Sequence, residues 1–289
     1  MKFNFLVCYY DTMENNFLIL PFLFNMPVVT AFYMTFEKEL KHHYLYGHEK
    51  YLRHISVDCI IFGFHNNELK VLLLKARYAG KWALPGGFIL KREHMDLAAR
   101  RILKQRTGLD EIYLQQFHVF SDPGRSTKKI NQQFLRNIGI KSEESWMFER
   151  FITVGYYALV DFTKVTPVPD TISDACEWFG IYDVPEMILD HNHIFDEALQ
   201  NLRMQLNFHP VGFNLLPKKF TMPELQKLYE TILDKELDRR NFQRKIIATA
   251  ILKRLDETKK GVAHKAPFYY KFDLPQYKKA LKTGLGFEL

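Results

Sequence analysis

Cysteine is scarce in this chain of 289 residues. The three cysteines, Cys8, Cys59 and Cys176, lie far apart, are odd in number and form no CxxC pair. They therefore predict neither a disulfide framework nor a thiolate metal site, and they favour a reducing, cytoplasmic compartment. With 47% hydrophobic and 25% charged residues, the composition is otherwise ordinary for a globular protein with one large domain or two smaller ones.

Charged residues are absent between Asn15 and Phe36. A stretch of this kind has to be compared with a signal peptide or a membrane anchor. Lys2 is the only basic residue ahead of it, prolines interrupt it, and no small-residue cleavage site is clear. We therefore expect residues 1–53 to be an N-terminal extension, with translation of the working protein beginning at Met34. A short hydrophobic helix is the alternative for the first part.

Acidic residues are in short supply at one end of the chain. From residue 210 to residue 289 there are 17 lysines and arginines against 9 aspartates and glutamates, whereas the rest of the chain has 23 against 24. The net charge of +7 therefore arises in the last quarter of the sequence. This concentration of positive charge predicts a domain that binds a polyanion, although a solvated basic surface would give the same count.

Carboxylates are also missing from a motif near the centre of the chain. A glycine-rich segment (GGFILKRE) and the helical pattern after it place Gly87, Glu93, Arg101 and Gly108 at the spacing of the Nudix box. That box carries three glutamates after its arginine. In their places this chain has Ile102, Gln105 and Arg106.

These three positions would share one face of a helix, because they are spaced at i, i+3 and i+4. Carboxylates on that face would hold Mg²⁺ or Mn²⁺ against a diphosphate. An aliphatic side chain, an amide and a guanidinium provide no anionic ligand, and Arg106 would repel a divalent cation. We therefore expect the loop and helix to keep their shape, with no metal, no cofactor and no catalytic residue.

Hydrophobic periodicity predicts an α/β fold around this motif. Strands are expected at residues 56–64, 69–76, 112–120, 151–162 and 176–182, and helices at residues 94–107 and 193–205. Interleaved strands and helices fit an α/β/α sandwich. With the glycine-rich loop after the second strand, they resemble the Nudix fold over residues 54–207. Residues 126–149 are polar with a helical middle, and we interpret them as an insertion.

The remaining residues, 208–289, predict a second domain. Thr221 begins a capping-box pattern ahead of an apolar helical face, and a second helix is expected at residues 238–247. Strands at residues 251–255 and 268–272 flank a basic loop. Two tightly joined helices followed by a hairpin with a basic tip is the order of a winged helix-turn-helix.

Cations gather on the second of these helices and at the tip of the hairpin. Arginine and asparagine can form paired hydrogen bonds with guanine and adenine edges, and lysine suits phosphates. The predicted DNA-contacting residues are Lys218, Lys219, Arg239, Arg240, Asn241, Arg244, Lys245, Lys260, His264 and Lys265. A small basic bundle that packs on the first domain is the simpler alternative.

A degenerate Nudix domain followed by a basic winged helix resembles the Nudix-related transcriptional regulators of the NrtR type. The segments VGFNLLPKKFT and LDRRNFQRKI are similar to the branch that responds to arabinose or xylose. The resemblance implies a homodimer that binds double-stranded operator DNA and uses the decayed box as the site of a small-molecule effector. That effector would be a sugar or a nucleotide-sugar-like metabolite, and no membrane partner is implied.

The effector would bind over the glycine-rich loop. Candidate lining residues, taken from the loop and from strand ends, are Lys75, Arg77, Gly86, Gly87, Phe88, Lys91, Glu93 and Asp122. Glu93 and Arg101 could instead form a structural ion pair.

Two other functions stay open at this point. One is a divergent hydrolase of nucleoside diphosphate derivatives such as ADP-ribose, with a metal held by Glu93, Asp96, Asp110 and Glu111. The other is an interaction module whose basic tail binds RNA or a protein.

Overall fold

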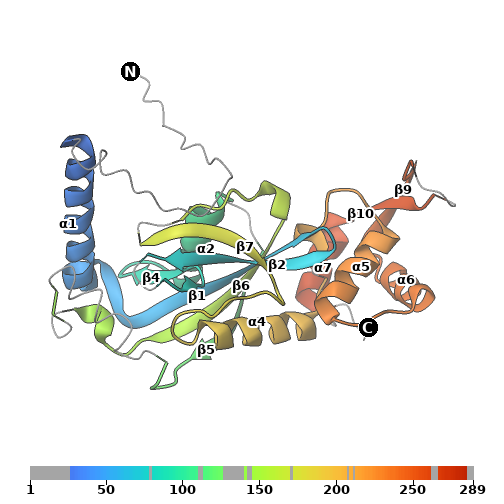
Figure 1. Ribbon diagram of the computed structural model, residues 1–289. Coiled ribbons are helices and arrows are strands. Elements are labelled where there is room, and N and C mark those ends of the chain that lie inside the picture. Colours follow the sequence, from blue (N-terminus) through green and yellow to red (C-terminus); the bar gives the residue numbers. More distant parts are fainter. Residues whose placement is uncertain are drawn as a thin grey trace. The chain divides into compact units, whose positions relative to one another are not determined.

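The structure, a computed structural model, describes residues 27–77, 80–109, 113–125, 140–141, 145–169, 172–206, 208–210, 212–261 and 266–284, without the side chains of residues 27–37 and Phe148. The chain forms two compact units, Met1–His43 and Tyr44–Leu289. Helix α1 (Pro27–Lys50) spans the boundary in sequence and continues without a break through Met34 (Figure 1). None of the described helices is long and apolar enough to cross a membrane.

A sheet of seven strands forms the centre of the second unit. Its strands are β1 (Tyr51–His65), β2 (Glu68–Ala76), β3 (Trp82–Ala83), β4 (Gly86–Leu90), β5 (Tyr113–Phe120), β6 (Ile152–Val160) and β7 (Ser173–Gly180). They are ordered β3-β2-β1-β6-β5, with β4 paired to β1 and β7 paired to β2. The β1–β6 pair is parallel, and the other pairs of this sheet are antiparallel.

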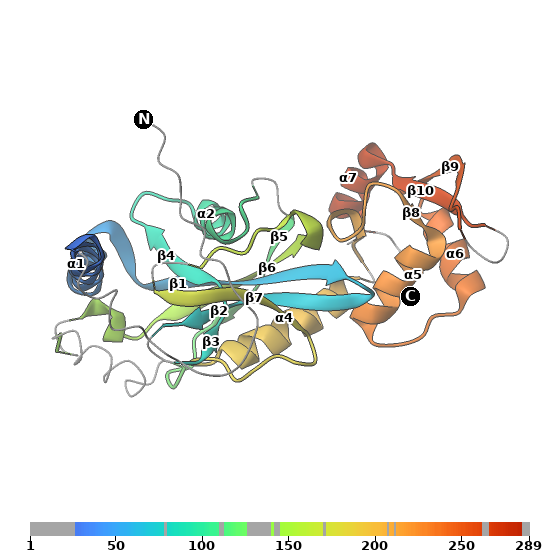
Figure 2. The ribbon, with the colours of Figure 1, turned by 45° about the horizontal axis from the view of Figure 1, so that its top comes forward.

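Alternate residues of β1 enter two different cores, because successive side chains of a strand point to opposite faces. Cys59 and Ile61 pack with helix α2 (Met95–Thr107), whereas Ile60 and Phe62 pack in the core that includes helix α4 (His191–Gln205). The two helices lie on opposite faces of the sheet (Figures 1 and 2). Burial on both faces explains the continuous apolar run of β1. The predicted α/β/α sandwich is therefore confirmed.

The β1–β2 hairpin closes through Asn66 and Asn67, which both have positive φ angles of 51° and 62°. His65 pairs with Glu68, so these two asparagines form a two-residue turn. Asparagine tolerates this left-handed conformation better than most residues, and two such residues give the turn a twist that matches the strands. The strands expected at residues 56–64 and 69–76 are therefore joined by this turn.

The C-terminal residues form the predicted winged helix. Helices α5 (Met222–Leu233) and α6 (Arg239–Ala248) are followed by the hairpin of β9 (Leu252–Thr258) and β10 (Phe268–Phe272). A short strand, β8 (Phe220–Thr221), pairs with β10 to complete a three-stranded sheet of order β8-β10-β9. Thr221 and Glu224 form both halves of the predicted capping box at the start of α5.

Helix α7 (Leu274–Thr283) follows the hairpin and was not among the predicted elements. Local signals for it are present in the sequence. The Asp273 side chain accepts a hydrogen bond from the backbone of Gln276, Pro275 stands in the first turn, and Gly284 follows the last residue. Tyr277 anchors the helix, because its hydroxyl donates to the carbonyl of Pro210 at 2.6 Å.

The core beneath α4 continues into the winged helix. Leu202 of α4 belongs to the same buried cluster as Leu228 of α5. Arg203 donates from Nε to the carbonyl of Ile232 at 2.8 Å, near the C-terminal end of α5 where helix carbonyls lack helical partners. The Thr231 hydroxyl lies 2.8 Å from the carbonyl of Lys227 in its own helix and 3.2 Å from that of Asn67 in the β1–β2 turn. Helix α5 is therefore tied to two elements of the α/β sandwich.

Other expectations differ from the structure in detail or fall outside it. The strand expected at residues 176–182 begins and ends earlier, as β7 (Ser173–Gly180), because Ile181 and Tyr182 enter the turn that leads towards α4. The strand expected at residues 251–255 starts one residue later and extends to Thr258 as β9. Of the proposed insertion, residues 126–139 and 142–144 lie outside the described part of the chain.

Replacing Thr221 with alanine tests the capping box. The Thr221 side chain accepts a hydrogen bond from the backbone of Glu224 and donates to the Glu224 carboxylate at 3.0 Å. We expect Thr221→Ala to lower the free energy of unfolding by about 1 kcal/mol, measured by denaturant titration of the full chain. The matched control is Thr283→Ala, at an exposed hydroxyl near the end of α7. Equal effects of the two substitutions would contradict the capping role.

Candidate effector site and nucleic-acid interface

Glu93 and Arg101 form an ion pair that fixes the glycine-rich loop to α2. Arg101 donates from Nε to Glu93 Oε1 at 2.8 Å and from Nη2 to Glu93 Oε2 at 2.7 Å. It also donates to the carbonyl of Phe88 at 2.9 Å, and Glu93 accepts from the backbone of Leu90 at 3.1 Å. The hydrogen bond from Arg101 holds the pKa of Glu93 below its ordinary value. The Glu93 carboxylate, which a hydrolase would need as a metal ligand, is thus already bound by Arg101 of α2.

The helix face that would hold a metal in an active Nudix enzyme carries no carboxylate. Ile102 is 1% exposed and packs under Gly87, where an added Cβ would lie 3.1 Å from Ile102 Cδ1. Gln105 is exposed and Arg106 is buried. Among the residues that the structure describes, no three His, Cys, Asp or Glu side chains gather as a metal site would require. The donor set at these positions therefore does not fit Mg²⁺.

Aromatic rings surround Phe88 on the loop. Its ring centroid lies 4.7 Å from that of Trp146, 5.5 Å from that of Phe151 and 5.8 Å from that of Tyr51. Trp146 is itself buried, and an added Cβ at Gly47 would come within 2.8 Å of its indole ring. These rings join the end of α1, the start of β1, the loop and the entry to β6 into one aromatic cluster.

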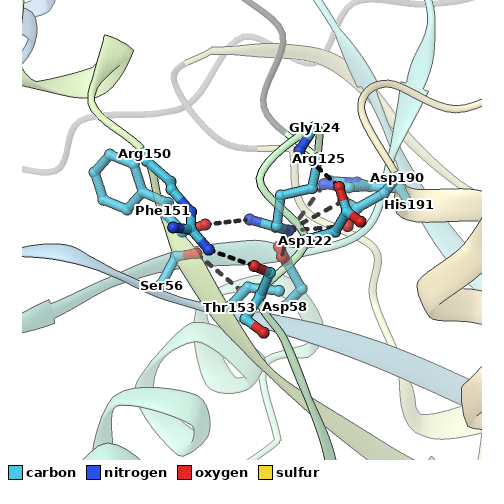
Figure 3. A network of polar contacts seen from close by, with 11 residues as sticks. Ser56, Asp58, Asp122, Gly124, Arg125, Arg150, Phe151, Thr153, Asp190 and His191 are labelled. Carbon is cyan, nitrogen blue, oxygen red and sulfur yellow. Dashed lines mark hydrogen bonds and ion pairs between the residues drawn. The ribbon is translucent and has the colours of Figure 1, made fainter.

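A buried polar cluster lies beside the loop (Figure 3). The side chain of Arg125 is 3% exposed, and it donates to both carboxylate oxygens of Asp190 at 2.9 Å and 3.0 Å. It also donates to the carbonyl of Phe151 at 3.2 Å and lies 3.7 Å from Oδ2 of Asp58. Asp58 comes so close to the loop that an added Cβ at Gly86 would lie 2.3 Å from its Oδ1.

His191, at the start of α4, completes this polar cluster. Its Nδ1 accepts a hydrogen bond from the backbone of Leu84 at 2.9 Å, and its Nε2 lies 4.0 Å from Oδ1 of Asp58. Burial lowers the pKa of His191, so the ring is neutral near pH 7. Sequence reasoning missed the whole cluster. The one signal available was Asp58, a carboxylate inside an otherwise apolar strand.

The structure brings together part of the predicted effector set. Gly86, Gly87 and Phe88 lie in β4, and Glu93 follows at the entry to α2. Asp122 lies near the polar cluster, where its Oδ1 accepts from the backbone of Gly124 at 2.6 Å (Figure 3).

Three other predicted effector residues have no contact with the polar cluster among the contacts that the structure describes. Lys75 sits on β2 opposite Trp82 and Ala175, with its ammonium 6.0 Å from the Trp82 ring. Arg77 donates to Asp174 at 2.7 Å. Lys91 is exposed beyond the end of β4.

Helix α6 presents cations on one side and apolar residues on the other. Phe242 and Ile246 are buried, whereas Arg239, Arg240 and Arg244 are exposed.

The N-terminal half of α6 is fixed by two hydrogen bonds. Asp238 caps the helix by accepting from the backbone of Asn241 at 2.8 Å. The Asn241 side-chain oxygen in turn accepts from Nη2 of Arg244 at 2.8 Å, which fixes the direction of that guanidinium. Lys245, next to the buried Ile246, is half-buried.

The predicted lysines outside α6 differ in their partners. Lys219 forms an ion pair with Glu257 at 2.7 Å. Lys259, which is outside the predicted set, pairs with Glu224 at 2.8 Å at the base of the hairpin tip. A phosphate would have to compete with these carboxylates. Lys218 and Lys260 are exposed. His264 and Lys265 lie outside the described residues.

Comparison with known families decides the assignment of the α/β sandwich. A model of the NUDIX domain matches residues 52–202, which is more than half of the chain. The chain belongs to the Nudix family. Within this member of the family, residues 212–272 match a second model, that of the NrtR DNA-binding winged helix domain. The order of domains is that of the NrtR-type regulators.

Individual relatives are similar to this chain over most of their length. The "ADPR responsive transcriptional repressor NtrR" of Acinetobacter baylyi is 29% identical over 231 residues, which cover 77% of this chain and 83% of that protein. Shewanella oneidensis NrtR is similar in structure with a TM-score of 0.65 and 23% identity, over 82% of this chain and 100% of that chain.

The same Shewanella protein in complex with a 27mer DNA gives a TM-score of 0.64 with 22% identity, over 81% of this chain and 99% of that chain. At these identities the structures establish the fold of this Nudix protein.

Replacing Glu93 with glutamine tests the ion pair. We expect Glu93→Gln to lower the free energy of unfolding at pH 7 by about 1.5–3 kcal/mol, because charge-assisted hydrogen bonds to a partly buried guanidinium are lost. The control is Glu149→Gln, which breaks the more exposed pair with Arg53 and should lower it by less than about 1 kcal/mol. Denaturant titration of both variants measures the difference.

The same substitution predicts a pH dependence. The pKa of Glu93 is lowered in the folded chain, so its stabilising effect is complete above the ordinary value of 4.5 and is lost as pH falls through the lower folded pKa. The stabilities of the parent chain and Glu93→Gln should therefore converge as pH falls below 4.5. A difference in the free energy of unfolding between the two chains that stays constant as pH falls below 4.5 would contradict the ion pair.

Proposed function

We propose that this Nudix protein is a transcriptional regulator that binds double-stranded operator DNA through α6 and releases it when ADP-ribose binds to the Nudix domain. The observation that carries the proposal is the exposed cationic face of α6 in a winged helix that follows a Nudix domain without carboxylates on its box helix. The regulator would act as a homodimer on two half-sites of the operator.

The chemistry of α6 favours duplex DNA over the simpler alternative of a basic bundle. A buried seam of Phe242 and Ile246 holds the helix on the domain, so Arg240 and Arg244 point away from it. Arginine on an exposed helix matches the paired acceptors of guanine in the major groove. The exposed Lys218 and Lys260 can contact the phosphates, which position a protein on its site.

Support for ADP-ribose as the effector comes from the name of the Acinetobacter baylyi relative, an ADPR-responsive repressor. Repression is proposed here on the same basis. Arabinose and xylose, which the resemblance of two segments implied, have no support among these relatives. The aromatic cluster around Phe88 and the polar cluster around Arg125 lie next to the loop on which a nucleotide would bind.

A route between the two domains supports regulation. Arg203 of α4 donates to the carbonyl of Ile232 at the end of α5, and lies 3.7 Å from Asp234 in the turn before α6. The N-terminus of α4 carries His191 and follows Asp190, both members of the polar cluster. One helix therefore contacts the candidate effector region at its start and the DNA-binding domain at its end. An effector acts through such a route only by its different affinity for the two arrangements.

The hydrolase alternative would need metal ligands from other carboxylates. Glu93 is bound by Arg101, and Asp96 accepts a hydrogen bond from the Tyr156 hydroxyl at 2.6 Å. Asp110 and Glu111 lie outside the described residues. We therefore place hydrolysis second to effector binding.

Alanine at Arg240 tests DNA recognition by α6. We expect Arg240→Ala to weaken binding to the preferred duplex by about 1–3 kcal/mol, because a paired contact with a base edge is lost. Lys278→Ala on α7 removes one exposed positive charge elsewhere in the domain and serves as the control. Fluorescence anisotropy with a labelled duplex measures both. Equal affinity for Arg240→Ala and the parent chain would remove α6 from the interface.

The effector is tested by titration in the presence of bound DNA. We expect ADP-ribose to release the labelled duplex, because it binds the DNA-free arrangement more tightly, and we expect arabinose and xylose to leave the complex intact. The same anisotropy assay follows the release, and isothermal titration calorimetry measures ADP-ribose binding without DNA. Release by a sugar but not by ADP-ribose would contradict the proposed effector and leave the DNA interface standing.

A further inference from the structure

An apolar side chain stands among the cations of α6. Ile247 is 49% exposed, whereas Ile246 beside it is fully buried. Ile247 follows Arg244 by three residues and Arg240 by seven. An α-helix turns by about 100° per residue, so residues at these spacings lie on the same side.

Arg240, Arg244 and Ile247 therefore form one surface, which we call the recognition face. Along the helix axis the face extends by about 10 Å, at about 1.5 Å for each residue. The major groove of B-DNA is about 12 Å wide and admits an α-helix. A helix that places Arg240 and Arg244 against base edges would thus bring Ile247 into the same groove.

We infer that Ile247 contacts the C5 methyl group of a thymine that neighbours the bases read by Arg240 and Arg244. This inference rests on the proposed function, because it requires α6 to enter the major groove. Ile247 would then be a residue that determines sequence specificity by apolar contact. A search for charged or hydrogen-bonding side chains does not find such a residue.

The chemistry of the groove selects this partner. The C5 methyl of thymine is the one apolar group that the base pairs present in the major groove, and aliphatic side chains contact it. An apolar protein surface is a poorer partner, because covering Ile247 would also bury the Arg240 and Arg244 guanidiniums without counter-charges. Phosphates and base acceptors around a thymine satisfy both guanidiniums while the methyl meets Ile247.

The test uses uracil in place of thymine, since uracil keeps the hydrogen-bonding groups and lacks only the methyl. A preferred duplex is first selected from a random pool with the full chain, and each of its thymines is then replaced by uracil in turn. Burying a methyl-sized group changes an equilibrium constant by about fourfold. We expect the parent chain to lose about fourfold in affinity at one thymine of each half-site, and Ile247→Ser to show no loss there.

Two further variants keep the test decisive. Ile247→Val retains branched methyl groups and should keep part of the preference for thymine, whereas Arg240→Ala should bind more weakly and keep all of it. Thermal unfolding checks that each variant is folded, which the exposure of Ile247 favours.

The possible results separate the inference from the proposed function. An equal loss for the parent chain and Ile247→Ser on uracil substitution, or no loss at any thymine, overturns the role of Ile247 and leaves DNA binding by α6 intact. Selection that yields no preferred duplex for the parent chain overturns the proposed function itself, and the role of Ile247 with it.

Discussion

Arg101 holds the glycine-rich loop to helix α2 by three hydrogen bonds, two to Glu93 and one to the carbonyl of Phe88. These bonds join β4, which pairs with β1, to the helix that covers one face of the sheet. Ile102 fills the space under Gly87 and supports the loop from within. The shape of the loop is thus maintained by an ion pair and apolar packing, and it needs no divalent cation between carboxylates.

The glycine-rich loop also contacts the polar cluster. Gly86 lets Asp58 approach the backbone of the loop, and Asp58 in turn lies beside Arg125 and His191. Buried charged groups are expensive unless they are paired, so a cluster of this kind fixes the segments that supply it. The segments here are β1, the turn at residues 121–125 and the start of α4. Helix α4 ends against α5, so a change at the loop has a continuous path of packed and hydrogen-bonded residues to the winged helix.

Much of the fold could be predicted from the sequence because its signals are local. The spacing of Gly87, Glu93, Arg101 and Gly108 predicted a helix where α2 occurs, and a loop where the structure has strand β4, paired with β1. The capping box predicted the start of α5, and the cations gathered between residues 238 and 247 predicted the exposed face of α6. Helix α7 had local signals of the same kind, Asp273 and Gly284, which the sequence analysis did not use.

The side-chain partners could not be predicted in the same way. Arg125 and Asp190 are 65 residues apart, and Lys219 and Glu257 are 38 apart, so only the tertiary fold brings them together. Periodicity says which face of an element is buried and gives no information about the partner of a charged group on it. Lys75 and Arg77, chosen from strand ends, lie beside β3 and β7, and their assignment to the effector site stays a prediction.

If the proposed function is right, this Nudix scaffold, which has no carboxylates on its box helix, binds a diphosphate without cleaving it. The most direct measurement is ³¹P nuclear magnetic resonance of ADP-ribose mixed with a stoichiometric amount of the full chain and excess Mg²⁺. We expect diphosphate signals that broaden or shift on binding and persist over time, with no phosphomonoester signal. The growth of phosphomonoester signals that require both Mg²⁺ and the chain would contradict this expectation.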